Sequence, residues 1–133
     1  MDKPAVIWVV EDDASTQRIV AAHLKANHFQ PVLFDSAEKA HAAMASQKPP
    51  ALLILDMLLP GMSGVDLIRL IKQNAVWAKI PIVVVTVLSR RDSLVSESEA
   101  TGAFWINKPF DTNNLIQTVQ GLPASVGYGG TRQ

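Results

Sequence analysis

The amino-acid sequence predicts one α/β domain built around a doubly wound, five-stranded parallel sheet. Short aliphatic and β-branched runs alternate along the chain with segments of helical period, which is typical of repeated βα units. Hydrophobic residues make up 48% of the 133 residues, enough for one sizeable core. Acidic, hydroxyl and basic side chains end or directly follow several predicted strands, where an open parallel sheet binds its ligands.

The predicted strands fall into a strong and a weak group. Three runs are rich enough in Val, Ile and Leu to be buried on both faces of a sheet, and they cover 6–10, 51–55 and 82–86. Two shorter runs, 31–34 and 104–107, complete the set. With right-handed crossovers, the expected strand order is 2-1-3-4-5.

The segments between the strands carry apolar residues on one helix face. This face is clear in three segments, with Ile19, Val20, His23 and Leu24, then Leu67, Ile68 and Ile71, then Leu115, Ile116, Val119 and Leu122. Helix start signals occur at Ala14 or Ser15, at Asp35 and Ser36, at Ser63, and at Asp111 and Thr112. The segment 92–101 predicts a further helix, the fourth in chain order, with a thin apolar face.

Charge and composition exclude several classes of protein. Lys and Arg equal Asp and Glu at 12 each, so net charge gives no reason to predict binding to nucleic acid or to a membrane. The sequence has no cysteine, no apolar run long enough to cross a bilayer, and no signal-peptide pattern at its start. We therefore expect a soluble cytoplasmic protein, with one domain over 1–122 and a flexible tail or linker over 123–133.

Three acidic residues are expected to meet at one edge of the sheet. Glu11 and Asp12 follow the first strand, and Asp56 follows the third, its neighbour in the predicted order. Carboxylates so close repel one another, and a hard divalent cation relieves that repulsion, so we predict a site for Mg²⁺, or Mn²⁺ in its place. Thr86 and Lys108, at the ends of the fourth and fifth strands, offer a hydroxyl and an ammonium group to phosphoryl oxygens. This set suits attack by Asp56 on phosphorus.

Each of these residues taken alone has a simpler structural role. Acids ahead of a helix are commonly caps, a class to which we assign Asp13, and Asp, Thr or Lys-Pro at a strand end is common turn chemistry. Four strand ends that deliver an acidic pair, an acid, a hydroxyl and an ammonium to one edge favour a functional site. The three histidines have no partners at metal-ligand spacing, and Trp8 and Trp77 are predicted to be packing residues.

Four motifs, in chain order VVEDD, LLILDMLLPGMSG, VVVT and NKPF, resemble the receiver domain of two-component response regulators. The resemblance covers about residues 5–121 and implies a flavodoxin-like fold of three layers, α/β/α. It also implies that Asp56 is the phosphoacceptor. Mg²⁺ would be bound by Glu11, Asp12 and Asp56 together with the backbone carbonyl of Leu58.

The same resemblance implies roles for residues at the ends of the fourth and fifth strands. Thr86 and Lys108 would bind the phosphoryl group. Thr86 and Trp105 would form a switch that changes the protein surface on phosphorylation. The peptide bond between Lys108 and Pro109 would be cis.

The function implied is a Mg²⁺-dependent signalling switch. A sensor histidine kinase or histidine phosphotransfer protein would supply the phosphoryl group to Asp56, and an unknown downstream protein would then bind differently. Such a domain promotes its own phosphorylation and dephosphorylation without being an enzyme for a separate substrate, and homodimer formation is compatible with this reading. The alternative is a receiver-like docking module that is not phosphorylated.

The sequence departs from the usual family pattern at several positions beside the expected site. Val87 is bulkier than the small residue common after the threonine, which predicts slower phosphoryl transfer or hydrolysis. Leu58 and Leu88 lack polar groups that could position an attacking water, which predicts a long-lived acyl phosphate. Trp105 is larger than the usual Tyr or Phe, and Gly102 falls one residue nearer Lys108 than is common, so switching and the fourth helix are expected to differ.

Other proteins of similar architecture have weaker support in the sequence. A phosphatase that forms an aspartyl phosphate needs an acid two residues after its nucleophile, where this chain has Leu58. A P-loop or dinucleotide-binding protein needs a glycine-rich turn after the first strand, and EDDAST contains no glycine. A flavin-binding protein would have a hydroxyl-rich or glycine-rich phosphate loop there rather than three acids.

Overall fold

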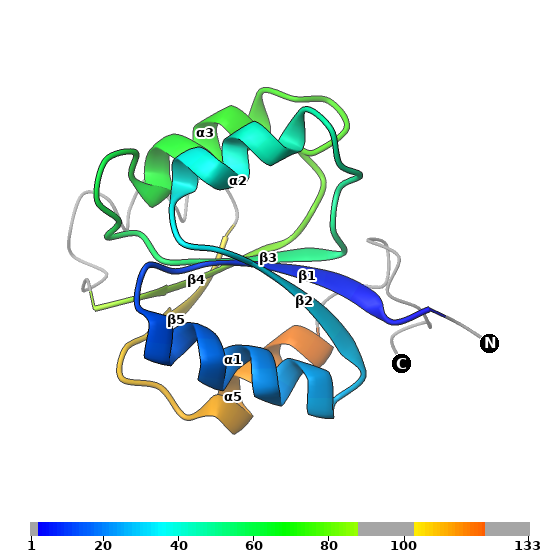
Figure 1. The fold of residues 1–133 in the computed structure, drawn as a ribbon, viewed down its shortest axis with the longest axis vertical. Coiled ribbons are helices and arrows are strands. Elements are labelled where there is room, and N and C mark those ends of the chain that lie inside the picture. Colours follow the sequence, from blue (N-terminus) through cyan, green and yellow to red (C-terminus); the bar gives the residue numbers. More distant parts are fainter. Residues whose placement is uncertain (1–2, 88–102, 122–133) are drawn as a thin grey trace.

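The computed structural model describes residues 3–87 and 103–121, which form a parallel sheet with helices on both faces (Figure 1). The five strands lie in the order β2-β1-β3-β4-β5, and all neighbouring pairs are parallel. This arrangement confirms the predicted doubly wound sheet and its strand order. The predicted fourth helix and the predicted tail lie outside the described residues.

The strands lie close to their predicted positions. They are β1 (Ala5–Val10), β2 (Phe29–Phe34), β3 (Leu52–Leu55), β4 (Ile82–Thr86) and β5 (Phe104–Asn107). β2 begins two residues earlier than its apolar run suggested, because it pairs with β1 along its whole length, from Phe29 opposite Ala5 to Phe34 opposite Val10. Pro31 is compatible with this pairing since β2 is an edge strand, where a missing N–H is tolerated.

Four helices are described: α1 (Ala14–Ala26), α2 (Ala37–Met44), α3 (Gly64–Lys72) and α5 (Thr112–Gln120). Each begins after a residue whose side chain accepts a hydrogen bond from a backbone N–H of the first turn: Asp13, Ser36, Ser63 and Asp111. Asp13 is thus the cap of α1, as predicted, and the helix begins at Ala14. Within the described ranges, no helix is long and apolar enough to cross a bilayer.

Two hydrophobic layers form, one on each face of the sheet. α2 and α3 cover one face, and α1 and α5 cover the other (Figure 1). Alternate residues of β1 enter opposite layers, Trp8 and Val10 toward α2 and α3, and Ile7 and Val9 toward α1 and α5. Trp8 and Trp77 are buried with their ring centroids 4.9 Å apart, which confirms them as packing residues.

The predicted apolar face of α1 is wrong at Ile19. Val20 and Leu24 are buried against the sheet, but the Ile19 side chain is 51% exposed. The face of α1 that packs on the sheet is centred on Val20, Ala21 and Leu24, so Ile19 turns sideways into an open cavity that Phe110 also lines. The faces predicted for α3 and α5 are buried as expected over the described residues.

Candidate functional site

The predicted site residues stand at the carboxyl ends of the strands, which share one edge of the sheet (Figure 1). The parallel hydrogen-bond ladder continues one residue past three strands. The backbone N–H of Glu11 donates to the Phe34 carbonyl (3.0 Å), that of Asp56 to Val10 (3.1 Å), and that of Lys108 to Thr86 (2.8 Å). The backbone at Glu11, Asp56 and Lys108 is therefore fixed by the sheet itself.

Glu11, Asp12 and Asp56 form a compact acidic cluster. One carboxylate oxygen from each lies within 4.8 Å of the others. Glu11 and Asp56 are buried, with 4% and 6% exposure, whereas Asp12 is open to solvent. Three hard oxygen donors with one side open to water suit a small divalent cation such as Mg²⁺, which keeps several of its waters.

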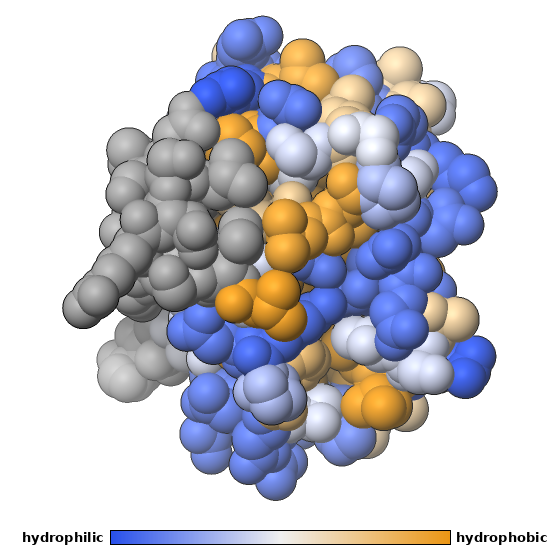
Figure 2. Space-filling view, turned by 90° about the vertical axis from the view of Figure 1, so that its left-hand side faces the viewer, coloured by the Kyte–Doolittle hydropathy of each residue, from blue (hydrophilic) through white to orange (hydrophobic). Residues whose placement is uncertain are grey.

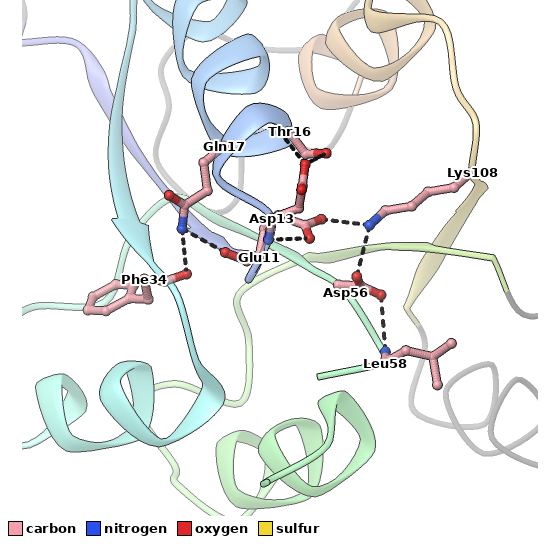
Figure 3. A network of polar contacts seen from close by, with 8 residues as sticks. All are labelled: Glu11, Asp13, Thr16, Gln17, Phe34, Asp56, Leu58 and Lys108. Atoms are coloured by element: carbon pink, nitrogen blue, oxygen red, sulfur yellow. Dashed lines mark hydrogen bonds and ion pairs between the residues drawn. The ribbon is translucent and has the colours of Figure 1, made fainter. Parts of the chain in front are cut away.

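Lys108 reaches from the end of β5 to two of these acids (Figure 3). Its Nζ lies 2.8 Å from Glu11 Oε1 and 2.8 Å from Asp56 Oδ2. Burial of the ammonium opposes its charge, but the hydrogen bonds to Asp56 and Glu11 outweigh that effect and raise the pKa of Lys108 above its usual value. The cluster contains three carboxylates and one ammonium group, so its net charge is negative and a further cation would stabilise it.

The protonation of Glu11 reflects two opposing influences. Burial disfavours its charged form and is the larger influence, while hydrogen bonds from Lys108 and from the Asp13 backbone N–H (3.1 Å) favour that form. The net result raises the pKa of Glu11 above its usual value. An additional positive charge beside Glu11 would therefore stabilise its ionised form.

Gln17 supports the β1–α1 connection and was missed by sequence reasoning. Its side-chain Nε2 donates to the backbone carbonyl of Glu11 (2.6 Å) and to that of Phe34 (3.3 Å), which ties α1 to the ends of β1 and β2 (Figure 3). A glutamine in the first turns of a helix has no distinguishing sequence signal. Only the packing of α1 on the sheet brings its amide to these carbonyls.

The β3–α3 loop, residues 56–63, is held by hydrogen bonds to its backbone and by buried apolar side chains. The Leu58 backbone N–H donates to Asp56 Oδ1 at 3.0 Å, and the Leu58 side chain is 45% exposed. The side chains on either side of it, Met57 and Leu59, are buried in the layer beneath α2 and α3. Glu38, also missed by sequence reasoning, accepts a hydrogen bond from the backbone N–H of Met62 at 2.9 Å.

The remaining predicted residues lie on β4 and β5. Thr86 is fully buried at the last position of β4, opposite Asn107. Trp105 is half-buried against the layer beneath α2 and α3, and its shielded indole N–H has no hydrogen-bond acceptor among the described residues. The peptide bond between Lys108 and Pro109 is cis.

An apolar surface adjoins the acidic cluster. Ile19, Val87 and Phe110 line an open cavity of about 460 Å³ whose wall also includes Lys108. Val87 is 63% exposed. Figure 2 views the molecule from this end and shows apolar surface bordered by strongly hydrophilic surface. Such a mixed patch is typical of a site where another protein binds.

Comparison with known proteins agrees with this geometry. Residues 7–120 match the response regulator receiver domain. Phosphate regulon transcriptional regulatory protein PhoB of Pseudomonas aeruginosa is 28% identical over 123 residues, which are 92% of this chain and 53% of PhoB. The chain therefore spans about half the length of that relative.

Solved structures show the same fold. A response regulator receiver protein from Pseudomonas putida superimposes with a TM-score of 0.81 at 28% identity, covering 90% of this chain and 98% of that one. The BeF₃-activated receiver domain of DrrB gives 0.75 at 25% identity, covering 88% and 95%. The family match covers β1 from Ile7, the other four strands and the four described helices. The chain therefore belongs to the response regulator receiver domain family.

Proposed function

We propose that this receiver domain is a signalling switch that accepts a phosphoryl group on Asp56 in a Mg²⁺-dependent reaction. The observation that carries the proposal is that the two carboxylate oxygens of Asp56 accept hydrogen bonds from different donors. Oδ1 accepts the Leu58 N–H at 3.0 Å, and Oδ2 accepts Lys108 Nζ at 2.8 Å. A buried carboxylate that contacts Lys108 and has Glu11 beside it suits a nucleophile.

In the proposed reaction, an oxygen of Asp56 forms a bond to phosphorus as the phosphorus–nitrogen bond of a phosphohistidine breaks. The departing imidazole keeps the electron pair of that bond. Mg²⁺ held by Glu11, Asp12, Asp56 and the Leu58 carbonyl would offset the charge of the phosphoryl oxygens. Lys108, which already contacts Asp56, would turn part of its hydrogen bonding toward the same oxygens.

The phosphodonor that fits this site best is another protein. A sensor histidine kinase or a histidine phosphotransfer protein must bring its phosphohistidine close to Asp56. The exposed apolar side chains of Ile19 and Val87 stand beside Lys108, next to that approach. Exposed apolar groups that border a charged site support protein contact more than they support small-molecule recognition.

Thr86 and Trp105 are the proposed output switch. Phosphorylation adds negative charge and acceptor oxygens, which would draw the Thr86 hydroxyl toward Asp56. Over residues 3–87 and 103–121, the shielded Trp105 N–H has no acceptor, and an unpaired buried donor costs about 1–3 kcal/mol. This cost favours a second position of the indole in which its N–H is solvated or paired, so that a downstream partner meets a different surface.

A docking module that is never phosphorylated remains the second candidate. One observation favours it: Lys108 pairs with both Glu11 and Asp56, so the buried acids have a counter-charge without any ligand. The two candidates differ in what happens at Asp56 when a phosphodonor is supplied.

The deciding experiment is intact-mass spectrometry after incubation with acetyl phosphate, with and without Mg²⁺. We expect one phosphoryl adduct that requires Mg²⁺ and disappears in Asp56→Asn. A beryllofluoride titration, which forms an aspartyl-phosphate mimic, would test the same site without turnover, and the BeF₃-activated DrrB domain supports that choice of probe. No adduct and no beryllofluoride complex in folded protein would favour the docking module.

A further inference from the structure

Glu38 lies in the first turn of α2, outside the acidic cluster, and contacts the loop that follows Asp56. Its Oε2 accepts the backbone N–H of Met62 at 2.9 Å, although 24 residues separate the two in sequence. The same oxygen packs so closely on Gly61 that a β carbon there would collide with it. Gly61 has a φ of +76°, so the backbone at this point both turns sharply and leaves room for the carboxylate.

The loop is closed at its base as well as at its tip. The Gly64 N–H donates to the Met57 carbonyl at 3.1 Å, and Ser63 caps α3 through the Asp66 N–H at 3.1 Å. Glu38 holds the tip at Met62. The chain between these two fixed points carries Leu58, whose N–H orients Asp56.

We propose that Glu38 is a positioning residue for the phosphorylation site. By holding Met62, it keeps the loop in the shape that places the Leu58 N–H against Asp56 and the Leu58 carbonyl at the cation. The proposal deepens the proposed function and rests on it for the role of the cation. The hydrogen bond from the Leu58 N–H to Asp56 is present in the metal-free protein, so it can be measured separately from cation binding.

The chemistry of the contact supports this role. Hydrogen bonds from the Met62 N–H and from the backbone N–H of Glu38 lower the pKa of the Glu38 carboxyl below its usual value. Glu38 is therefore ionised at neutral pH, and a charge-assisted hydrogen bond to the loop is stronger than a neutral one. An acid in the first turn of a helix also stabilises the helix by interacting with its dipole, and this is the competing explanation for Glu38.

Three variants separate the two explanations. Glu38→Ala removes both the contact with Met62 and the charge. Glu38→Gln removes the charge but keeps an oxygen that can accept the Met62 N–H. Asp35→Ala, the matched control, removes an exposed acid from the same end of α2, where it pairs with Lys39 and not with the loop.

The measurements are amide hydrogen exchange of Leu58 in the metal-free protein and the Mg²⁺ dissociation constant from titration calorimetry. For Glu38→Ala, we expect faster exchange at Leu58 and Mg²⁺ binding weakened about three- to tenfold, the range for loss of one hydrogen bond. Glu38→Gln keeps a neutral acceptor that makes a weaker hydrogen bond, so it is expected to lie between the wild type and Glu38→Ala in both measurements. Asp35→Ala is expected to match the wild type.

The proposal is overturned if Glu38→Ala leaves Leu58 exchange unchanged, or if Glu38→Gln loses as much as Glu38→Ala. The second result would assign the effect to charge at the start of α2. Failure of the wild-type protein to bind Mg²⁺ or to form an acyl phosphate would instead count against the proposed function, because the exchange measurement requires neither metal nor phosphodonor.

Discussion

The two loops that supply the acidic residues are held by different sets of interactions. After β1, Glu11 is fixed by polar contacts: Lys108 on its side chain and Gln17 on its carbonyl. After β3, Asp56 is followed by Met57 and Leu59, whose side chains are buried in the core. Both buried carboxylates contact Lys108, but the loop after β3 has in addition an apolar anchor in the core.

This difference matters for the proposed function, in which Asp56 accepts a charged phosphoryl group. Polar contacts can be redistributed when a phosphoryl group arrives, because Lys108 can exchange one oxygen partner for another. A buried methionine has no such freedom, since a close-packed core resists displacement. We therefore expect phosphorylation to rearrange the contacts of Lys108 while the backbone at Met57 stays in place.

The largest effect is expected from removing the apolar anchor. Met57→Ala should lower the free energy of unfolding by about 2–5 kcal/mol, because Met57 is fully buried and its truncation leaves a cavity. Chemical denaturation of Met57→Ala beside Leu58→Ala makes the comparison within one loop. The exposed Leu58 should change stability by no more than about 0.5 kcal/mol. Equal losses would mean that the loop has no apolar anchor.

The next effect concerns the closeness of the β3–α3 loop to α3. A β carbon at Gly64 would lie 2.7 Å from the Asp56 carbonyl oxygen and 2.7 Å from Met57 Cα, both of them backbone atoms. Gly64→Ala should therefore destabilise the protein by about 1–3 kcal/mol. Gly121→Ala is the control, since its nearest contact would be 3.3 Å. Thermal unfolding with no difference between the two variants would contradict the close approach at Asp56.

A smaller loss is expected on the polar side. Gln17→Leu keeps the side-chain size but leaves the Glu11 and Phe34 carbonyls without their amide donor, at a cost of about 1 kcal/mol. Denaturant titration measures this loss, with the exposed Gln47→Leu as the control. A loss as large as that of Met57→Ala would remove the distinction between the two loops.

Leu58, the exposed side chain of the β3–α3 loop, allows a test of phosphate chemistry rather than of stability. Leu58 offers no hydrogen bond to a water that attacks the acyl phosphate, so Leu58→Asn should shorten the lifetime of phosphorylated Asp56. The decay of the phosphoryl adduct can be followed by mass spectrometry, with the exposed Val76→Asn as a control away from the site. An unchanged half-life would undermine the prediction of a long-lived phosphate.

The smallest effect is a pH dependence from Glu38. Because its folded pKa is lowered, Glu38 contributes stability that is present above its unfolded value of about 4.5 and is lost as the pH falls through the lower folded value. Glu38→Gln removes this titration. The stability difference between wild type and Glu38→Gln should therefore shrink on acidification below pH 4.5, as measured by denaturant titration across that range. A stability difference that increases below pH 4.5 would contradict the lowered pKa of Glu38.

The sequence predicted the fold and the edge of the sheet at which the acids meet. Apolar runs that end at Glu11 and Asp56 mark the strand ends, because a charged side chain is costly inside a sheet that is buried on both faces. Periodicity failed at Ile19, since it defines an apolar face without showing which residue at its margin overlaps the sheet. It also gave no sign of Gln17 or Glu38, whose residue types are common on exposed helix surfaces.

The sequence by itself therefore determined which residues stand at the strand ends, since local hydrophobicity decides where each strand stops. Only the tertiary structure decided how they are held. Lys108 meets Glu11 across 97 residues, and Glu38 meets Met62 across 24. Such contacts depend on strand order and on how helices pack over the sheet, and no local pattern specifies which long polar side chain will reach which partner.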